Sequence, residues 1–307
     1  MRYEISLILA AYFKFKIKTV NGKKYTIKNP LVILKKEGTI KLTNGDTFIF
    51  NKDNKKYILN IINFLLNEGI EFGNGKYQWK FDQKNGIIET HQGIRFKMQT
   101  VGLLDETFLY QIHFPGFDLK GKTVVTAGAY IGDTPLFYSY YGAKVFAFEP
   151  DPNSFKKAEE NILLNPALKN NITLRNYAIG IDGEVDFPVE NDSGGSSIYD
   201  TNAKNKIKVK SVSIKTILNE FNISDPYLLD LDIKGAEFIV IEDPAISNFK
   251  KVRIEYSPYL LNQSSKTLEY LIEKLKSYGF TKVRVFKHSC SRYDLTYHGT
   301  LEAEKGD

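Results

Sequence analysis

One stretch of the chain decides the fold: residues 118–151 read DLKGKTVVTAGAYIGDTPLFYSYYGAKVFAFEPD. It contains two apolar runs, Thr123–Ala127 and Lys144–Phe148, which are typical of buried strands. Between them lie a glycine-rich turn and a segment with helix signals, and Glu149 directly follows the second run. The stretch therefore predicts a strand, a loop, a helix and a second strand, which is the repeating unit of nucleotide-binding α/β sheets.

The turn and helix signals between the two runs are local. Gly128 and Gly132 favour a tight turn after the first strand, because glycine adopts backbone conformations that other residues avoid. Asp133 and Thr134 are typical of the first turn of a helix, and Gly142 favours its end. The predicted helix therefore begins directly beside the turn.

The spacing of the glycines indicates which ligand the turn binds. A dinucleotide-binding turn has the pattern G-x-G-x-x-G, whereas residues 128–132 read G-A-Y-I-G and lack the middle glycine that lets a phosphate approach. No P-loop pattern is present either. Glu149 stands about twenty residues after the turn, where a carboxylate accepts hydrogen bonds from ribose hydroxyls. The pattern favours a nucleoside without a phosphate, such as S-adenosylmethionine; the alternative is that the glycines serve packing alone.

Three blocks of sequence together resemble the FkbM-type S-adenosylmethionine-dependent methyltransferases: Val124–Asp151, SGGSSI at Ser193–Ile198 and DLDIKGAE at Asp230–Glu237. In that family the first and third blocks read approximately VVDIGANIGDTS, with a following FEPDP, and KIDVEGAE. The resemblance extends over roughly residues 118–290 and implies a Rossmann-like, seven-stranded α/β sheet. It also implies S-adenosylmethionine as the cofactor and methyl transfer to a hydroxyl of a small-molecule, sugar or lipid acceptor.

The resemblance also implies which residues form the site. Most of them lie in the first block, and Ala178 follows the third expected strand, where such enzymes contact the adenine. The implied cofactor-binding residues are Thr126, Gly128, Ala129, Tyr130, Gly132, Asp133, Thr134, Glu149, Pro150, Asp151, Ala178 and Asp230. Asp232 and Glu237 are the candidate catalytic residues, and no metal site is expected.

The candidate catalytic residues follow the fourth expected core strand, Tyr227–Leu231. Because the carboxyl ends of parallel strands face the ligand crevice, Asp232 is placed to orient an acceptor hydroxyl and take its proton. For Glu237, a catalytic role and a role in holding the turn between strand and helix are equally favoured. Glu255, at the end of Val252–Tyr256, is a third carboxylate at this edge.

Four residues depart from the family pattern. Thr126 replaces an acidic residue, Tyr130 replaces an asparagine, Asp230 replaces a lysine and Lys234 replaces a glutamate. If Asp230 and Lys234 meet, they form an ion pair of reversed polarity. The alternative is a protein that binds the cofactor and has lost turnover.

The alternation of strands and helices continues after Glu149. Asn153 or Ser154 is expected to cap the next helix and Ser264 the last one. The glycine- and serine-rich loop 191–200 is expected to close over a substrate; the alternative is a plain flexible connection. The expected segments are a helix at 154–165, strands at 172–176, 184–189 and 206–212, a helix at 264–278 and an antiparallel pair at 282–287 and 293–301.

The N-terminal third predicts a separate, small α+β domain. Asn-Gly pairs at 21–22 and 44–45 separate alternating apolar runs and predict hairpins, and apolar residues recur at helical spacing from Tyr57 to Leu66. We place an accessory domain at residues 1–104 and the methyltransferase domain at 105–307. The accessory domain carries no chemical motif, so substrate selection or contact between copies of the chain is its expected role.

The composition is that of an ordinary globular protein: of 307 residues, 42% are hydrophobic and 25% are charged. The single cysteine, Cys290, excludes an intramolecular disulfide framework and a cysteine-rich metal site, and it favours a cytoplasmic location. The apolar run Ile5–Phe13 is too short to span a bilayer, so no membrane span is expected.

The formal net charge of +6 raises the alternative of an RNA methyltransferase. Yet the lysines are spread along the chain, and no RNP, KH or zinc-finger pattern accompanies them. A lysine-rich solvated surface is therefore preferred, and nucleic acid is a less favoured partner than a small-molecule, glycan or lipid acceptor.

Overall fold

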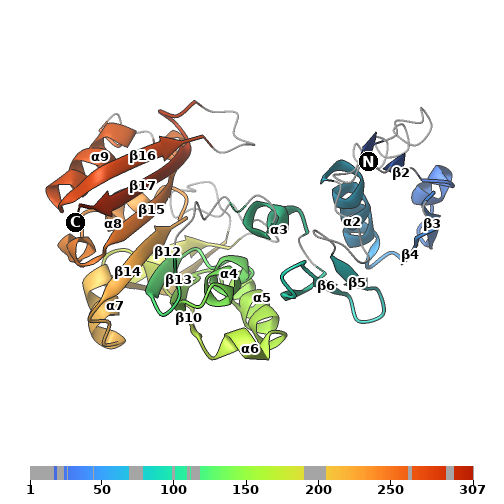
Figure 1. Ribbon diagram of the computed structural model, residues 1–307, viewed down its shortest axis with the longest axis horizontal. Helices are drawn as coiled ribbons and strands as arrows, with labels where there is room; N and C mark the ends of the chain where they lie inside the picture. Colours follow the sequence, from blue (N-terminus) through green and yellow to red (C-terminus); the bar gives the residue numbers. More distant parts are fainter. Residues whose placement is uncertain are drawn as a thin grey trace. The chain divides into compact units, whose positions relative to one another are not determined.

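The computed structural model of the chain divides it into two compact units, Met1–Pro115 and Gly116–Asp307 (Figure 1). Helix α3 (Val101–Phe108) spans the domain boundary that the sequence predicted after residue 104. The structure describes residues 17–18, 24–25, 27–43, 45–68, 79–98, 101–108, 111, 118–189, 205–261, 265–287 and 294–306.

The first unit combines short antiparallel sheets with helices, as predicted. Strands β3 and β4 pair antiparallel on either side of Gly45, which has a φ of +100°. Trp79 is fully buried, and its Nε1–H donates to His91 Nδ1 at 3.1 Å. The elements are β1 (Ile17–Lys18), β2 (Lys24–Tyr25), η1 (Pro30–Leu34), β3 (Gly38–Lys41), β4 (Thr47–Phe50), α2 (Lys55–Glu68), β5 (Lys80–Asp82), β6 (Ile87–Glu89) and β7 (Arg95–Lys97).

The second unit is built on a seven-stranded sheet with the order β10-β9-β8-β14-β15-β17-β16. The pairings from β10 to β15 are parallel, and β17 is antiparallel to both of its neighbours. This order confirms the predicted Rossmann-like sheet with an antiparallel edge. The strands are β8 (Thr123–Ala127), β9 (Lys144–Phe148), β10 (Ile172–Arg175), β14 (Pro226–Leu231), β15 (Lys251–Tyr256), β16 (Phe280–Phe286) and β17 (Gly299–Lys305).

Helices cover both faces of this sheet because successive side chains of a strand point to opposite faces. On one face, Val125, Leu229 and Ile254 share a core with α7 (Ile214–Glu220), α8 (Glu237–Val240) and α9 (Leu268–Ser277). On the other face, α4 (Asp133–Tyr140) lies against β8, β9 and β10. Helices α5 (Pro152–Leu163) and α6 (Pro166–Lys169) follow β9, and η2 (Pro244–Asn248) and η3 (Pro258–Leu260) flank β15.

A separate three-stranded sheet has the order β11-β13-β12. Its strands are β11 (Ala178–Ile179), β12 (Gly183–Pro188) and β13 (Lys206–Val212), so the two extra strands of the prediction are confirmed. The loop predicted to close over a substrate lies outside the described residues.

The predicted cap of α5 is wrong. The helix begins at Pro152, because the Asp151 side chain accepts hydrogen bonds from the backbone N–H groups of Asn153 and Ser154, at 2.7 and 2.8 Å. These two residues are therefore the capped ones. For α9, Thr267 is the cap, since its hydroxyl accepts from the backbone N–H of Tyr270; Ser264 lies outside the described residues.

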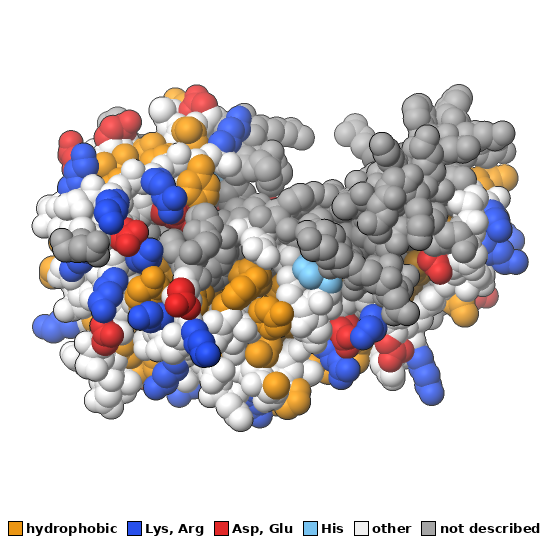
Figure 2. Space-filling model, in the orientation of Figure 1, with side chains coloured by type: hydrophobic (Ala, Val, Ile, Leu, Met, Phe, Trp, Pro, Cys, Tyr) orange, Lys and Arg blue, Asp and Glu red, His pale blue; other side chains and the backbone are white. Residues whose placement is uncertain are grey.

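Charged side chains of both signs are mixed on the face shown in Figure 2, where lysines and arginines lie among acidic and uncharged residues. Several lysines of the second unit form ion pairs with acidic side chains. They include Lys208–Asp186, Lys210–Glu220, Lys250–Asp225, Lys251–Glu304 and Lys274–Glu242. Part of the positive charge of this unit is thus neutralised locally.

Candidate active site

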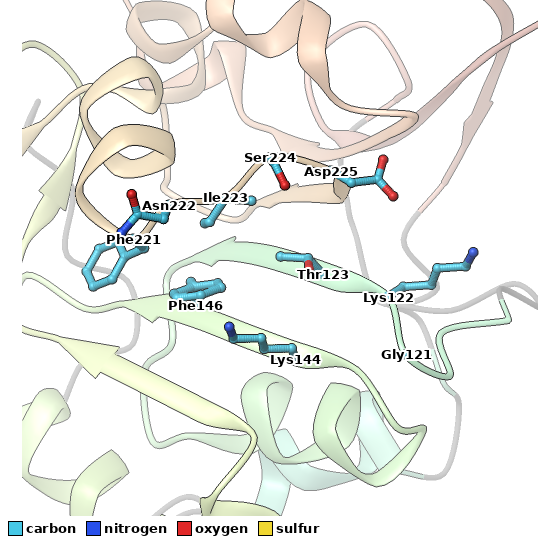
Figure 3. Close-up of a pocket in the computed structure, with 10 residues that line it drawn as sticks. All are labelled: Gly121, Lys122, Thr123, Lys144, Phe146, Phe221, Asn222, Ile223, Ser224 and Asp225. Carbon is cyan, nitrogen blue, oxygen red and sulfur yellow. The ribbon is translucent and has the colours of Figure 1, made fainter.

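A hollow of about 320 Å³ lies at the amino ends of β8 and β9, beside the turn that precedes β14 (Figure 3). Both lysines that line the hollow form cation–π contacts: Lys122 Nζ lies 5.3 Å from the centroid of the Tyr227 ring, and Lys144 Nζ lies 5.2 Å from that of the Phe146 ring. Because open α/β sheets bind their ligands at the carboxyl ends of the strands, the opposite edge is the candidate site.

At that edge, the loop after β8 is tied to the neighbouring strand ends. The backbone N–H groups of Gly128 and Ala129 both donate to the Phe148 carbonyl, and that of Asp232 donates to the Ala127 carbonyl. A Cβ atom at Gly128, where φ is +87°, would lie 2.1 Å from the Asp232 carbonyl oxygen. Only glycine therefore lets the loops after β8 and β14 come this close.

Gly132 has a similar role at the start of α4. Its φ is +85°, and a Cβ atom there would lie 3.2 Å from Cα of Ala158 in α5. Both glycines of the turn therefore serve contacts within the chain, which is the packing explanation that the sequence left open. Their approach to a ligand stays a prediction.

Glu149, directly after β9, is buried beneath this loop. Its Oε2 accepts from the Tyr130 N–H at 2.7 Å, and its Oε1 accepts from the Asp151 N–H at 3.0 Å. Burial raises the pKa of the Glu149 carboxyl to about 7, although the two backbone N–H groups act in the opposite direction. Tyr130 has a φ of +44°, a conformation that is uncommon for a residue with a side chain.

Asn176 fixes the backbone that carries Glu149. Its Nδ2 donates to the carbonyls of Glu149 and Pro150, at 2.7 and 3.0 Å. The side chain of Asp151 is engaged as the α5 cap. Of the expected cofactor-binding set, Glu149, Pro150 and Asp151 are thus brought together with Tyr130 as one ordered corner.

The remaining expected contacts lie around this corner. Asp133 and Thr134 are buried in the first turn of α4. Ala178 lies in the small sheet, where it is paired with Ser211 and packs against Phe187 and Val209. A contact between Ala178 and an adenine stays a prediction.

Asp230 and Thr126, two of the expected cofactor-binding residues, lie in a buried polar group. The Asp230 carboxylate forms an ion pair with Arg253 Nη1 at 2.5 Å and accepts hydrogen bonds from the hydroxyls of Tyr138 at 2.6 Å and Thr126 at 3.2 Å. Both Asp230 and Thr126 are only 1% exposed. Asp230 thus pairs with Arg253 and not with Lys234, and a cofactor contact of Asp230 or Thr126 stays a prediction.

This buried group belongs to a row of polar side chains across five strands. Strand register aligns Thr126, Asp230, Arg253, Glu302 and Arg284 as successive neighbours. The Asp230 charge raises the pKa of Arg253 even though burial opposes it. Nε and Nη2 of Arg253 and Oε1 of Glu302 are buried without a hydrogen-bond partner in the described parts of the chain. The charge that departs from the family pattern at residue 230 is therefore balanced within the sheet.

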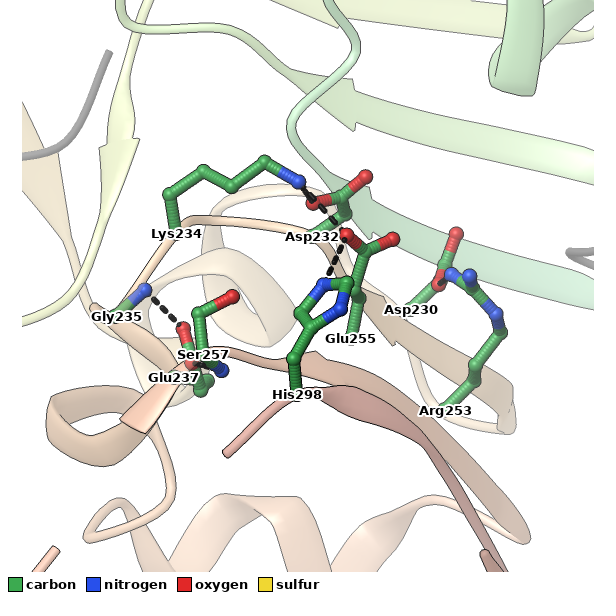
Figure 4. Close-up of polar contacts among 9 residues, drawn as sticks. All are labelled: Asp230, Asp232, Lys234, Gly235, Glu237, Arg253, Glu255, Ser257 and His298. Atoms are coloured by element: carbon green, nitrogen blue, oxygen red, sulfur yellow. Dashed lines mark hydrogen bonds and ion pairs between the residues drawn. The ribbon is translucent and has the colours of Figure 1, made fainter. Parts of the chain in front are cut away.

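A second group of charges lies at the carboxyl ends of β14 and β15 (Figure 4). Lys234, which has a φ of +48°, donates from Nζ to Asp232 Oδ1 and Glu255 Oε1, each at 2.8 Å. His298 Nε2 lies 3.2 Å from the same Glu255 oxygen. Burial alone would lower the pKa of Lys234, but the two carboxylates raise it well above its ordinary value. The lysine is therefore a fixed cation between two anions.

Glu237 is separate from this group although it is close in sequence. It is fully buried, and its two oxygens accept from the backbone N–H groups of Gly235 at 2.6 Å and Ser257 at 2.7 Å. Burial raises the pKa of the Glu237 carboxyl to about 7. Glu237 thus joins the turn after β14 to the end of β15, and its catalytic role stays a prediction.

The residues around Glu149 fit a ribose-bearing cofactor. Each carboxylate oxygen has two lone pairs and uses one for a backbone N–H, so each can still accept a hydrogen bond from a hydroxyl.

For metal ions, no group of three or more histidine, cysteine or acidic residues in the described segments is arranged to hold one. Across those same segments, no helix combines the length and apolar character needed to cross a membrane.

Sequence reasoning missed three residues of this region: Asn176, Arg253 and His298. Arg253 carried a signal, since it is a charged residue inside the apolar strand Val252–Tyr256. Asn176 and His298 carried none, because their contacts depend on chain segments 27 and 43 residues away.

Comparison with known proteins identifies one family. The family model described as Methyltransferase FkbM domain matches residues 127–282, just over half of the 307-residue chain. This range contains the loop after β8, Glu149 and the Asp232 turn. No curated protein sequence matches the chain.

Several solved structures are similar in fold. Precorrin-6y C5,15-methyltransferase from Geobacter metallireducens is 13% identical, with 77% of this chain and 98% of that chain covered and a TM-score of 0.37. Magnesium protoporphyrin IX methyltransferase from Synechocystis PCC 6803 with bound SAM is 15% identical, with coverage of 62% and 72% and a TM-score of 0.37. TYW2 from M. jannaschii in complex with AdoMet is 14% identical, with coverage of 77% and 90% and a TM-score of 0.39.

Proposed function

The chain belongs to the FkbM methyltransferase family, and we propose that it transfers a methyl group from S-adenosylmethionine to a hydroxyl oxygen of a small-molecule, sugar or lipid acceptor. The observation that carries this proposal is the buried Glu149 corner. There a carboxylate with two remaining lone pairs lies beneath the loop of residues 128–132, at the carboxyl end of the central strands.

In this proposal, Glu149 binds the ribose of the cofactor. Tyr130 and Asp151 hold its two oxygens through their backbone N–H groups, and Asn176 fixes the carbonyls of Glu149 and Pro150. The carboxylate is therefore oriented before the cofactor arrives, which reduces the entropy that binding would otherwise cost. When bound, S-adenosylmethionine supplies an electrophilic methyl group.

Asp232 is the proposed proton acceptor. Its backbone is held at the strand edge by Ala127, and its Oδ1 is fixed by Lys234. Its side chain keeps 27% of its surface exposed, so an acceptor hydroxyl can reach it. When the acceptor oxygen bonds to the methyl carbon, the carbon–sulfur bond of the cofactor would break and S-adenosylhomocysteine would leave, while the proton of the hydroxyl would pass to the Asp232 carboxylate.

Glu237 and Asp230 take positioning roles in this scheme. Glu237 holds the backbone of Gly235 and Ser257, and Asp230 balances Arg253 within the sheet. Thr126 donates to Asp230, Asp230 pairs with Arg253, and Lys234 pairs with Asp232 and Glu255. Because each of these side chains has a partner, the substitutions at residues 126, 230 and 234 are compatible with turnover. This supports an active enzyme over a protein that only binds the cofactor.

An RNA acceptor has less support. The basic side chains of the second unit are mixed with acidic ones, and several are paired with them. An RNA-binding face instead gathers unpaired lysines and arginines along one surface.

Metabolite profiling of a deletion strain tests the proposal. Loss of the gene should remove one methylated compound and accumulate its counterpart that is lighter by one CH2 group. The purified protein should then methylate that counterpart on oxygen, whereas methyl incorporation into RNA alone would overturn the acceptor class.

A further inference from the structure

His298 reaches the catalytic edge because β17 runs antiparallel to β15. Register pairs Glu255 with Thr300 and Tyr256 with Gly299, so the start of β17 lies beside the end of β15. His298 directly precedes β17 and therefore comes to the edge formed by the ends of the parallel strands. Its side chain is 13% exposed.

The imidazole is held on two sides. Nε2 lies 3.2 Å from Glu255 Oε1, and the ring of Tyr259 in η3 meets the imidazole edge-on with centroids 5.8 Å apart. A neutral imidazole that faces a carboxylate keeps its proton on the facing nitrogen, so Glu255 fixes the tautomer with hydrogen on Nε2. The ring is thus fixed in orientation and in protonation pattern.

Glu255 Oε1 is shared by two donors, because it also accepts from Lys234 Nζ at 2.8 Å. Lys234 in turn contacts Asp232, so a chain of contacts links His298 to the proposed proton acceptor. With His298 neutral, Asp232, Lys234, Glu255 and His298 carry a net charge of −1; with His298 protonated they carry none. Within these four residues the imidazole changes the net charge; from outside the group, the buried Arg253 acts on Glu255 and Asp232, and Glu149 acts on Asp232.

We propose that His298 is a positioning residue of the methyl-transfer site, which acts on Asp232 through Glu255 and Lys234 and, once protonated, makes Asp232 a weaker proton acceptor. The proposal rests on the proposed function of Asp232. Protonation places a full positive charge 3.2 Å from Glu255 Oε1, so a protonated His298 takes a larger share of that carboxylate. Lys234 then turns toward Asp232 and stabilises its charged form. Neutral His298 leaves Lys234 divided between both carboxylates.

Nuclear magnetic resonance tests this coupling without any methyl acceptor. In the full chain with 13C-labelled histidine, His298→Gln identifies the His298 signal among those of the four histidines. Removing a nearby anion should lower the titration midpoint of that signal, by about one pH unit in Glu255→Gln and by roughly half of that in Asp232→Asn. Lys234→Met should raise the midpoint, because it removes a nearby cation. Glu304→Gln, which removes a carboxylate from the same strand outside the group, is the matched control and should leave the midpoint unchanged.

A midpoint that responds to Glu255→Gln but not to Asp232→Asn or Lys234→Met would overturn the proposal, since His298 would then be coupled only to Glu255.

Once the acceptor is known, the pH profile of methyl transfer gives a second test. It is measured at saturating S-adenosylmethionine, so that the ionisation of Glu149 does not enter. His298→Gln keeps an N–H donor but cannot titrate, so it should retain the wild-type rate within a few-fold at alkaline pH and lose part of the decline at acidic pH. An unchanged acidic decline in this variant would also overturn the proposal, whereas a failed search for the acceptor affects only the proposed function.

Discussion

Replacing Asp230 by asparagine is expected to destabilise the second unit by on the order of 3–5 kcal/mol. Asparagine keeps the shape and the contacts with Tyr138 and Thr126, but it leaves the Arg253 guanidinium, which is fully buried, without its anion. Removing one partner of a buried ion pair costs this much because the remaining charge stays in a medium that solvates it poorly. The double variant Asp230→Leu with Arg253→Leu removes both charges and should recover at least half of the loss.

Guanidinium chloride denaturation of the full chain measures both variants. Circular dichroism follows the whole chain, whereas fluorescence of Trp79, the single tryptophan, follows the first unit and serves as the internal control. A loss below about 1 kcal/mol for Asp230→Asn would show that Asp230 is not the necessary counter-ion of Arg253, because the guanidinium would then be solvated in another way. Asp230→Lys, the residue of the family pattern, should be worse than asparagine, since it places a second cation beside Arg253.

Three further predictions concern carboxylates of the site. Burial raises the pKa of the Glu149 carboxyl to about 7, so cofactor affinity should decline by roughly tenfold per pH unit below that value. Calorimetry should show this decline in the wild type. Glu149→Gln should bind the cofactor weakly at every pH and show no decline. Burial also raises the pKa of the Glu237 carboxyl, from 4.5 to about 7, so between these pH values the folded state holds a proton that the unfolded state has lost, and the free energy of unfolding falls as the pH rises. Denaturation at several pH values should show a shallower fall in Glu237→Gln than in the wild type. An unchanged slope in this variant would contradict the burial of Glu237. Asp232→Asn should lower turnover by roughly 100-fold and change cofactor affinity only a few-fold, whereas loss of cofactor binding and of stability would assign Asp232 a structural role.

The sheet could be predicted from sequence because its signals are local. The runs Thr123–Ala127 and Lys144–Phe148 are apolar, bounded by turn residues, and match β8 and β9 at both ends. The cap of α5 could not be chosen so easily, because Asp151, Asn153 and Ser154 are all good capping residues and only the hydrogen bonds decide among them.

Only the site residues at the carboxyl ends of core strands could be predicted from the sequence. Asp232 and Glu255 follow from the rule that ligands bind at the carboxyl ends of parallel strands. The pairing of Asp230 with Arg253, and of His298 with Glu255, depends on register between strands that are distant in sequence. For that reason, Asp230 and Lys234 read as a swapped ion pair in the sequence but belong to two separate charge groups in the structure.

The proposed function requires that the Glu149 corner binds S-adenosylmethionine. Isothermal titration calorimetry of the purified chain with S-adenosylhomocysteine, and with NAD as the competing dinucleotide, tests this requirement. We expect micromolar binding of S-adenosylhomocysteine, strongly weakened in Glu149→Gln, and no binding of NAD. Micromolar binding of NAD with no response to S-adenosylhomocysteine would contradict it.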